Sequence, residues 1–270
     1  MAGLARYLRL YLALGRFGLA RELAFRGNFL VKMFVELLWF GIVLAFYETV
    51  FTKTSAIATW QRSEYLFFVG CYFSLLALIE ALFLSNCSEF AELIRTGDLD
   101  FFLLQPIDEQ FLITCRSIDW SCVANVAMGF CVMGIGLYQM GWAFSLGRAT
   151  AFLALFLCGV AIAYSLLVFL TSISVWFKRN QSLYELWWLF TSLARYPKEI
   201  FAGRWAGPLG RFFTWIIPVL VVVNVPAGVM ARKLDDPWMI LFTVLAAAVL
   251  LYASRRFFRY ALKRYRSASS

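Results

Sequence analysis

The residues most able to do chemistry gather in one polar stretch, residues 86–117, which separates two strongly apolar stretches. Asn86 with Glu89 three positions later is typical of a helix start, and Gly97 suits the end of that helix. An apolar stripe lies between them at helical spacing, made of Phe90, Leu93 and Ile94. We therefore expect a short amphipathic helix in this stretch.

The same stretch is acidic and contains an apolar run, a combination that favours contact with another protein. Its charged side chains are Glu89, Glu92, Asp98, Asp100, Asp108 and Glu109 against Arg95 and Arg116. The run is Phe101, Phe102, Leu103 and Leu104, with Pro106 after it. Such a helix suits a groove on a partner protein, with Asp98 and Asp100 as pairing charges. The predicted contact area is Phe90, Leu93, Ile94, Phe101 and Phe102. The alternative is a solvated loop against lipid headgroups, which its acidic character disfavours.

Several kinds of chemistry are excluded by what the sequence lacks. It has no histidine, which removes histidine metal sites, Ser-His-Asp triads and histidine proton relays. It has no G-x-x-x-x-G-K-[ST] motif, the loop that cradles ATP phosphates. We therefore predict no catalytic residue, no metal site and no cofactor bound by this chain, and a membrane-embedded enzyme is disfavoured.

A few charged residues interrupt the apolar stretches. Lys32 and Glu36 lie four positions apart in the first stretch, and Glu80 lies in the second. All three fall near one predicted membrane edge, so ion pairs of Lys32 with Glu36 or Glu80 are favoured over ion translocation. No carboxylate is expected at mid-membrane depth, where a proton- or sodium-driven carrier needs its coupling group. The energy source is therefore expected outside this chain.

Composition identifies the elements that must position these residues. Of the 270 residues, 62% are hydrophobic and 15% are charged, against roughly 45–50% and 25% in soluble domains. A bilayer core takes about 20 apolar residues per helix. We predict an all-α integral membrane protein with a single transmembrane domain, residues 28–270. Its six spans are 29–51, 65–85, 118–140, 150–176, 183–201 and 237–254.

The count of six spans depends on residues 205–232. In its apolar part, residues 212–230, Pro218, Pro226 and Gly228 argue against a plain spanning helix, so we favour a re-entrant or interfacial helix pair; a seventh, kinked span is the alternative. Pro197 is expected to end the fifth span, and Asn224 to satisfy backbone groups that the prolines leave free. The predicted outer lid contains Arg195, Tyr196, Pro197, Pro218, Asn224 and Pro226.

Basic residues at both ends indicate the orientation. Residues 1–27 carry five arginines and one glutamate, and residues 255–270 carry six basic residues and no acid. The positive-inside rule then predicts both termini in the cytoplasm, which requires an even number of spans. Residues 1–27 are expected to form an interfacial helix whose arginines face anionic lipid; packing against the body of the protein is the alternative.

Three motifs resemble one family of transporters. The segment TGDLDFFLLQPI (Thr96–Ile107) is similar to the (R/K)-x-G-(D/E)-(L/I)-D-x-x-L-L-x-P pattern of type-2 exporter permeases of ATP-binding cassette transporters. ARYPKEIF (Ala194–Phe201) and IPVLVVVNVPAG (Ile217–Gly228) resemble later motifs of that family. The positions that match the first pattern are Arg95, Gly97, Asp98, Asp100, Leu103, Leu104 and Pro106.

The resemblance covers nearly the whole chain and implies an assembly of two permeases and two ATPases in the bacterial inner membrane. The second permease would be identical or a sister subunit, and residues 86–105 would form the coupling helix that sits in a cleft of a cytoplasmic ABC ATPase dimer. ATP and magnesium would be bound by that ATPase. Membrane lipid is a further expected partner, and nucleic acid is not.

An amphipathic or hydrophobic compound is the expected cargo, moved outward. Trp187, Trp188 and Phe190 could line its path, although lipid contact or core packing is the favoured explanation of these side chains. The rival function is an ATP-independent channel or a membrane scaffold.

Overall fold

Helices make up almost all of the computed structural model, which describes residues 2–177, 181–231 and 236–265. The fold is 84% helical, which confirms the predicted all-α class. Five helical stretches in the described residues are long and apolar enough to cross a membrane. They are α2 (Arg26–Phe51), the stretch Arg62–Thr96 that starts with α3 (Arg62–Ile79), Trp120–Gln139 with α8 (Val123–Gln139), α9 (Leu146–Phe177) and α13 (Pro237–Arg264). These stretches overlap the first four predicted spans and the last one.

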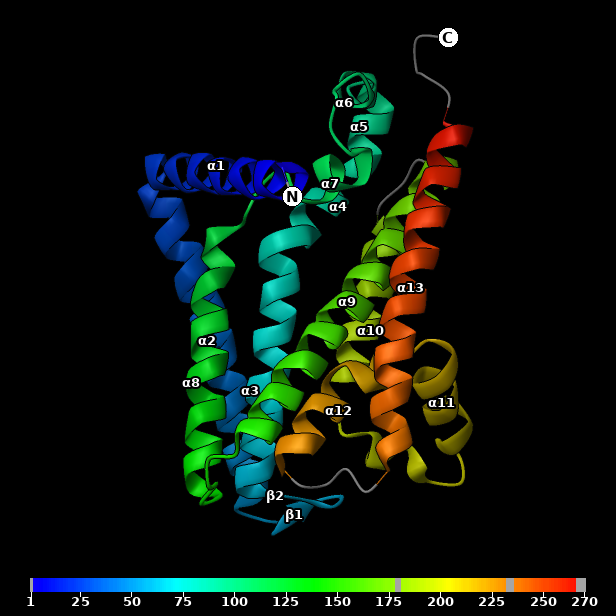
Figure 1. Ribbon diagram of the computed structural model, residues 1–270. Coiled ribbons are helices and arrows are strands. Elements are labelled where there is room, and N and C mark those ends of the chain that lie inside the picture. Colours follow the sequence, from blue (N-terminus) through cyan, green and yellow to red (C-terminus); the bar gives the residue numbers. More distant parts are fainter. Residues whose placement is uncertain (1, 178–180, 232–235, 266–270) are drawn as a thin grey trace.

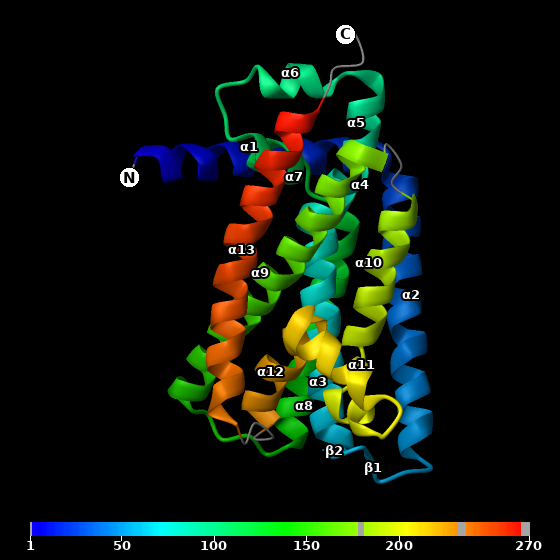
Figure 2. The same ribbon diagram turned by 90° about the vertical axis from the view of Figure 1, so that its right-hand side faces the viewer.

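One end of the bundle carries most of the short helices (Figure 1). Helix α1 (Ala2–Ala24) lies across this end, which we call the α1 end. After α3 the chain passes through a π-helical turn (Glu80–Leu84) and α4 (Ser85–Ser88) into α5 (Phe90–Thr96), α6 (Leu99–Leu103) and α7 (Glu109–Thr114). Figure 2 shows α5 and α6 projecting beyond α1. Helix α1 and the C-terminal end of α13 lie at the same end of the bundle. The positive-inside rule predicts that both ends of the chain lie on one side of the membrane.

The opposite end, the β1 end, carries a small antiparallel hairpin of β1 (Ala56–Ile57) and β2 (Trp60–Gln61). The indole of Trp60 is 1% exposed, and its Nε1 donates a hydrogen bond to Glu199 Oε2 at 3.1 Å. Glu199 lies in the 3-10 helix Lys198–Ala202, which follows Pro197. The hairpin is therefore tied to the segment that the sequence predicts to be an outer lid.

Helices α3 and α8 pack closely because glycines remove side chains from their contact. A Cβ built on Gly70 of α3 would lie 2.7 Å from Met133 N, and one on Gly129 of α8 would lie 2.3 Å from Ser74 Oγ. Without a hydrophobic driving force between helices in lipid, close backbone approach at small residues supplies the packing energy. This pair forms the centre of the main core with Phe67, Phe68 and Tyr72.

The predicted fifth span, 183–201, is not one helix. Helix α10 (Gln181–Ala194) has 14 residues and ends before Pro197, as expected from the proline, and the chain then enters the short 3-10 helix. At 1.5 Å per residue α10 is about 21 Å long, short of a 30 Å hydrocarbon core.

The segment that decides the span count is sharply bent. Residues Gly207–Ile216, formed by α11 (Gly207–Arg211) and a π-helical turn (Phe212–Ile216), meet α12 (Val219–Ala231) at an angle of 85°. The bend falls at Ile217 and Pro218, whereas Pro226 lies inside α12 without ending it. Asn224 accepts a hydrogen bond from Lys198 N at 2.8 Å and donates to Leu220 O at 2.7 Å. Its amide thus joins α12 to the 3-10 helix that follows Pro197.

Candidate functional site

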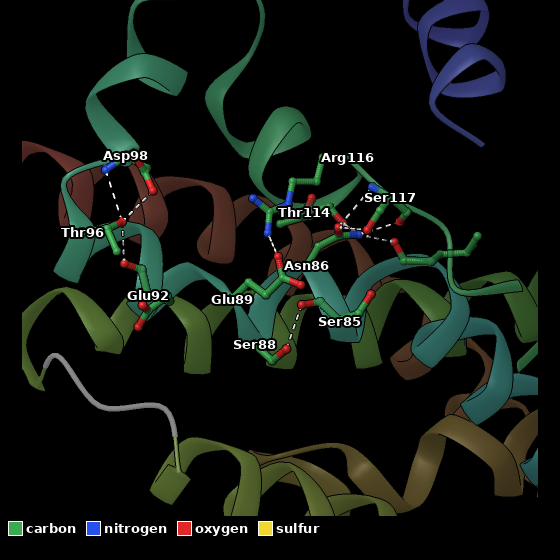
Figure 3. A network of polar contacts seen from close by, with 11 residues as sticks. Ser85, Asn86, Ser88, Glu89, Glu92, Thr96, Asp98, Thr114, Arg116 and Ser117 are labelled. Atoms are coloured by element: carbon green, nitrogen blue, oxygen red, sulfur yellow. Dashed lines mark hydrogen bonds and ion pairs between the residues drawn. The ribbon is translucent and has the colours of Figure 1, made fainter. Parts of the chain in front are cut away.

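The segment from α5 to α7, residues 90–114, is held at its base by the side chain of Asn86 (Figure 3). Asn86 is 1% exposed. Its Nδ2 donates to the carbonyl oxygens of Leu82, Thr114 and Ser117 at 3.1, 3.1 and 2.8 Å. Its Oδ1 accepts from Ser117 N at 3.1 Å and from Ser117 Oγ at 2.7 Å. One amide therefore joins the beginning and the end of the segment.

The prediction that Asn86 begins a helix is wrong. Asn86 lies inside α4, and α5 starts after Glu89 without a side-chain cap. Glu89 instead forms an ion pair with Arg116, which lies 27 residues later in the chain (Figure 3). The sequence signal was local, and the actual partners of both side chains lie across the segment.

The predicted apolar stripe exists, but this protein covers it itself. Phe90, Leu93 and Ile94 are at most 9% exposed, and they pack with Leu99 against α9 and α13. The neighbours on those two helices are Val168, Val175, Phe258 and Ala261. The expectation that Phe90, Leu93 and Ile94 offer contact area to a partner is therefore wrong, because helical periodicity identifies an apolar face without identifying what covers it.

The outward face of the segment lies around α6. Phe101 is 69% exposed and Leu104 82%, while Phe102 and Leu103 are half-buried and Pro106 is exposed. Glu92 and Arg95 form an exposed ion pair on α5. Gly97 ends α5 with a positive φ of 82°, as predicted for a helix stop, and Asp98 Oδ2 accepts a hydrogen bond from Thr96 Oγ1 at 2.8 Å.

Asp108 connects the segment to two distant helices, a role that the sequence did not reveal. Its Oδ2 lies 2.5 Å from Arg255 Nη2 of α13, and its backbone N donates to Tyr7 Oη of α1 at 3.0 Å. Its Oδ1 accepts from Phe111 N at 3.1 Å and caps α7. Burial alone would raise the pKa of this carboxyl, but the hydrogen bonds from Arg255 and Phe111 outweigh burial and lower it.

Helix α7 is also bound to α9 through Tyr164. Gln110 Nε2 donates to Tyr164 Oη at 2.9 Å, and Thr114 Oγ1 lies 3.1 Å from the same oxygen. The segment is thus in contact with α1, α9 and α13 through polar side chains.

Two of the three charged residues predicted inside the membrane lie at a cavity of about 530 Å³ between α2, α3, α8 and α10. Glu36 and Glu80 both line it. Lys32 lines a neighbouring cavity of about 310 Å³ instead. In the described part of the chain no ion pair joins Lys32 to Glu36 or Glu80; Glu36 accepts a hydrogen bond from Asn125 Nδ2 at 2.7 Å.

The three aromatic residues proposed for a cargo path separate in the structure. Trp188 is 48% exposed and lines the large cavity. Trp187 is 3% exposed and packs in the main core, and Phe190 is half-buried against it. Arg195 also lines the cavity, and its guanidinium lies over the ring of Tyr72, 5.7 Å from the ring centroid. Tyr196 is 41% exposed beside the break at Pro197.

These features define a class, the multi-pass helical membrane proteins that carry a braced helical segment beyond one end of the bundle. The chain belongs to the ABC-2 family of transporter proteins, whose family model matches residues 37–269. It is therefore a membrane component of an ABC transporter, which in general works with a separate ABC ATPase. Comparisons with curated proteins and with solved structures gave no match.

Proposed function

We propose that this chain is the permease subunit of an ATP-driven exporter and that the α5–α7 segment is its coupling element, docked on a cytoplasmic ABC ATPase. The observation that carries the proposal is the exposure of two large apolar side chains, Phe101 and Leu104, on a projecting segment that is braced at its base. Exposed apolar side chains on a rigid support are the kind of group that dominates binding energy when a partner buries them.

The charges around this apolar tip suit a selective contact. Glu92, Arg95 and Asp98 are exposed beside Phe101, and Asp100 is half-buried in the first turn of α6. Charges at the rim of an interface select the partner and its register more than they add affinity. The revised contact area is therefore Phe101 and Leu104, with acidic residues around them.

Transmission of motion follows from the bracing contacts. Displacement of α6 by an ATPase would move α4 through Asn86, α13 through Asp108 and Arg255, and α9 through Tyr164. Short rigid helices that shift as bodies are an established way to carry a small displacement to distant helices. The chain needs no nucleotide site of its own for this, because ATP and magnesium belong to the ATPase.

The location, the second permease and the cargo belong to the same proposal. We propose that the protein resides in a bacterial inner membrane with both termini cytoplasmic, that it pairs with an identical or sister permease, and that it exports an amphipathic or hydrophobic compound. The bent pair Gly207–Ala231 would be re-entrant from the outer side. The large cavity beside Trp188 would form part of the cargo path.

Co-purification with the proposed ABC ATPase partner tests the docking. We expect Phe101→Ser to weaken the complex by about 30-fold, since truncating a central interface side chain costs about 2 kcal/mol. The double variant Asp98→Lys with Asp100→Lys should reduce both assembly and stimulated ATP hydrolysis. Phe17→Ser is the matched control, because Phe17 has the same 69% exposure on α1.

Unchanged assembly and hydrolysis in the Phe101 and aspartate variants would contradict the docking assignment. Transport that continues in the absence of any ATPase would favour the rival function, an ATP-independent channel.

A further inference from the structure

The large cavity has an apolar, aromatic wall. Trp39 of α2, Tyr72 of α3, and Tyr184 and Trp188 of α10 line it, together with Phe73 and Leu76. Its volume of about 530 Å³ matches the range of roughly 300–1,000 Å³ that is usual for small-molecule sites. Aromatic faces carry negative electrostatic potential, so this wall is as well suited to a cation as to a neutral apolar group.

Three carboxylates and one basic residue line the same cavity. Glu36 accepts one hydrogen bond from Asn125, and Asp119 accepts from Ser121 N at 3.1 Å. Glu80 forms no hydrogen bond or ion pair within the described ranges. The one basic residue among the described lining residues is Arg195, which stacks over Tyr72. An ionised carboxylate in a membrane span is costly unless it is paired, and a cation that enters the cavity would supply a partner for Glu80.

A buried amide on the same wall lacks one of its hydrogen bonds. Asn125 is 5% exposed, and its Nδ2 is used by Glu36, but its Oδ1 has no hydrogen-bond partner in the described residues. This oxygen is buried away from the cavity, whereas the Nδ2 bond holds the Glu36 carboxylate on the cavity wall. A cationic N–H donor fits beside carboxylates such as those of Glu36 and Glu80.

The backbone is also irregular at this point of α3. Glu80 is the first residue of the π-helical turn Glu80–Leu84 that separates α3 from α4. Single π-helical turns inside α-helices frequently coincide with functional sites. No three histidine, cysteine, aspartate or glutamate residues in the described ranges are arranged to hold a metal ion, which favours an organic ligand.

We propose that this cavity binds an organic ammonium ion, with its charge between Glu36 and Glu80 and its apolar body against Trp39 and Trp188. The cargo would then be a cationic amphiphile. This identity as cargo rests on the proposed export function, whereas the binding itself requires neither nucleotide nor ATPase.

Binding to the full chain in nanodiscs, without nucleotide, tests the proposal. Pyrenemethylamine and pyrenemethanol share one aromatic body and differ in the ammonium group, and energy transfer from tryptophan to pyrene reports their binding. We expect the amine to bind at least about tenfold more tightly than the alcohol, which corresponds to about 1.4 kcal/mol. Glu80→Gln and Glu36→Gln should each abolish most of this preference.

Glu185→Gln is the matched control, because Glu185 is exposed on α10 next to Tyr184 but does not line the cavity. Melting temperatures of all variants establish that they are folded. Equal affinity for amine and alcohol, or a preference that survives in the folded Glu36 and Glu80 variants, would overturn the proposal. Loss of ATPase docking with retained amine selectivity would refute the proposed function alone, and the reverse result would refute this inference alone.

Discussion

Replacement of Asn86 by leucine tests the bracing of the α5–α7 segment. Leucine has nearly the same volume but cannot make the five hydrogen bonds of the amide. Four of these five bonds join α4 to Thr114 and Ser117 at the other end of the segment. At about 1 kcal/mol net for each bond, the loss is about 3–4 kcal/mol, part of which is the penalty for buried carbonyl groups left unpaired.

Hydrogen–deuterium exchange of the purified protein measures this loss locally. A decrease of about 3 kcal/mol in the free energy of opening corresponds to exchange roughly 100-fold faster. We expect this increase in residues 99–114, with little change in the middle of α9. Asn28→Leu is the control, since Asn28 is exposed. An increase below about threefold, or an equal increase in α9, would refute the view that Asn86 braces this segment specifically.

Two further variants test packing and charge. Gly129→Ala should cost about 1–3 kcal/mol of stability through overpacking, because its Cβ would lie 2.3 Å from Ser74 Oγ. Gly134→Ala, on the same helix but with open space around its Cβ, should have the melting temperature of the wild type. Equal melting temperatures of the two variants would refute the packing argument. The pKa of Asp108 is lowered from 3.8, so its contribution is complete above about pH 4 and is lost as the pH falls through the lower folded-state value. Asp108→Asn should therefore show a shallower fall of melting temperature in acid than the wild type, and parallel curves would show that the Arg255 contact does not stabilise the fold.

Much of the fold follows from features that a sequence shows directly. Long apolar runs predict spanning helices, and Pro197 predicts the end of α10. The effect of Pro226 could not be read in the same way. Whether a proline breaks a helix in a membrane depends on which neighbouring groups satisfy the freed backbone, and here α12 continues through it.

The candidate site was predicted less completely, because its contacts are not local. Asn86 and Glu89 look like a helix start, yet their partners, Ser117 and Arg116, lie 31 and 27 residues away. The same limitation applies to Phe90, whose apolar face was identified correctly while its cover, α9 and α13, came from the tertiary fold. Glu36 and Glu80 were recognised as intramembrane charges, but only the arrangement of α2 and α3 places them at one cavity.

Photo-crosslinking from the tip of α6 tests the central claim most directly. A photoreactive amino acid at Leu104, which is 82% exposed, should crosslink to the ABC ATPase in intact membranes. The same group at Tyr138, which is 87% exposed in the last turn of α8, should not. Crosslinking of Tyr138 instead of Leu104, or of neither in an assembly that hydrolyses ATP and transports, would contradict the assignment of this segment as the point where the ATPase acts.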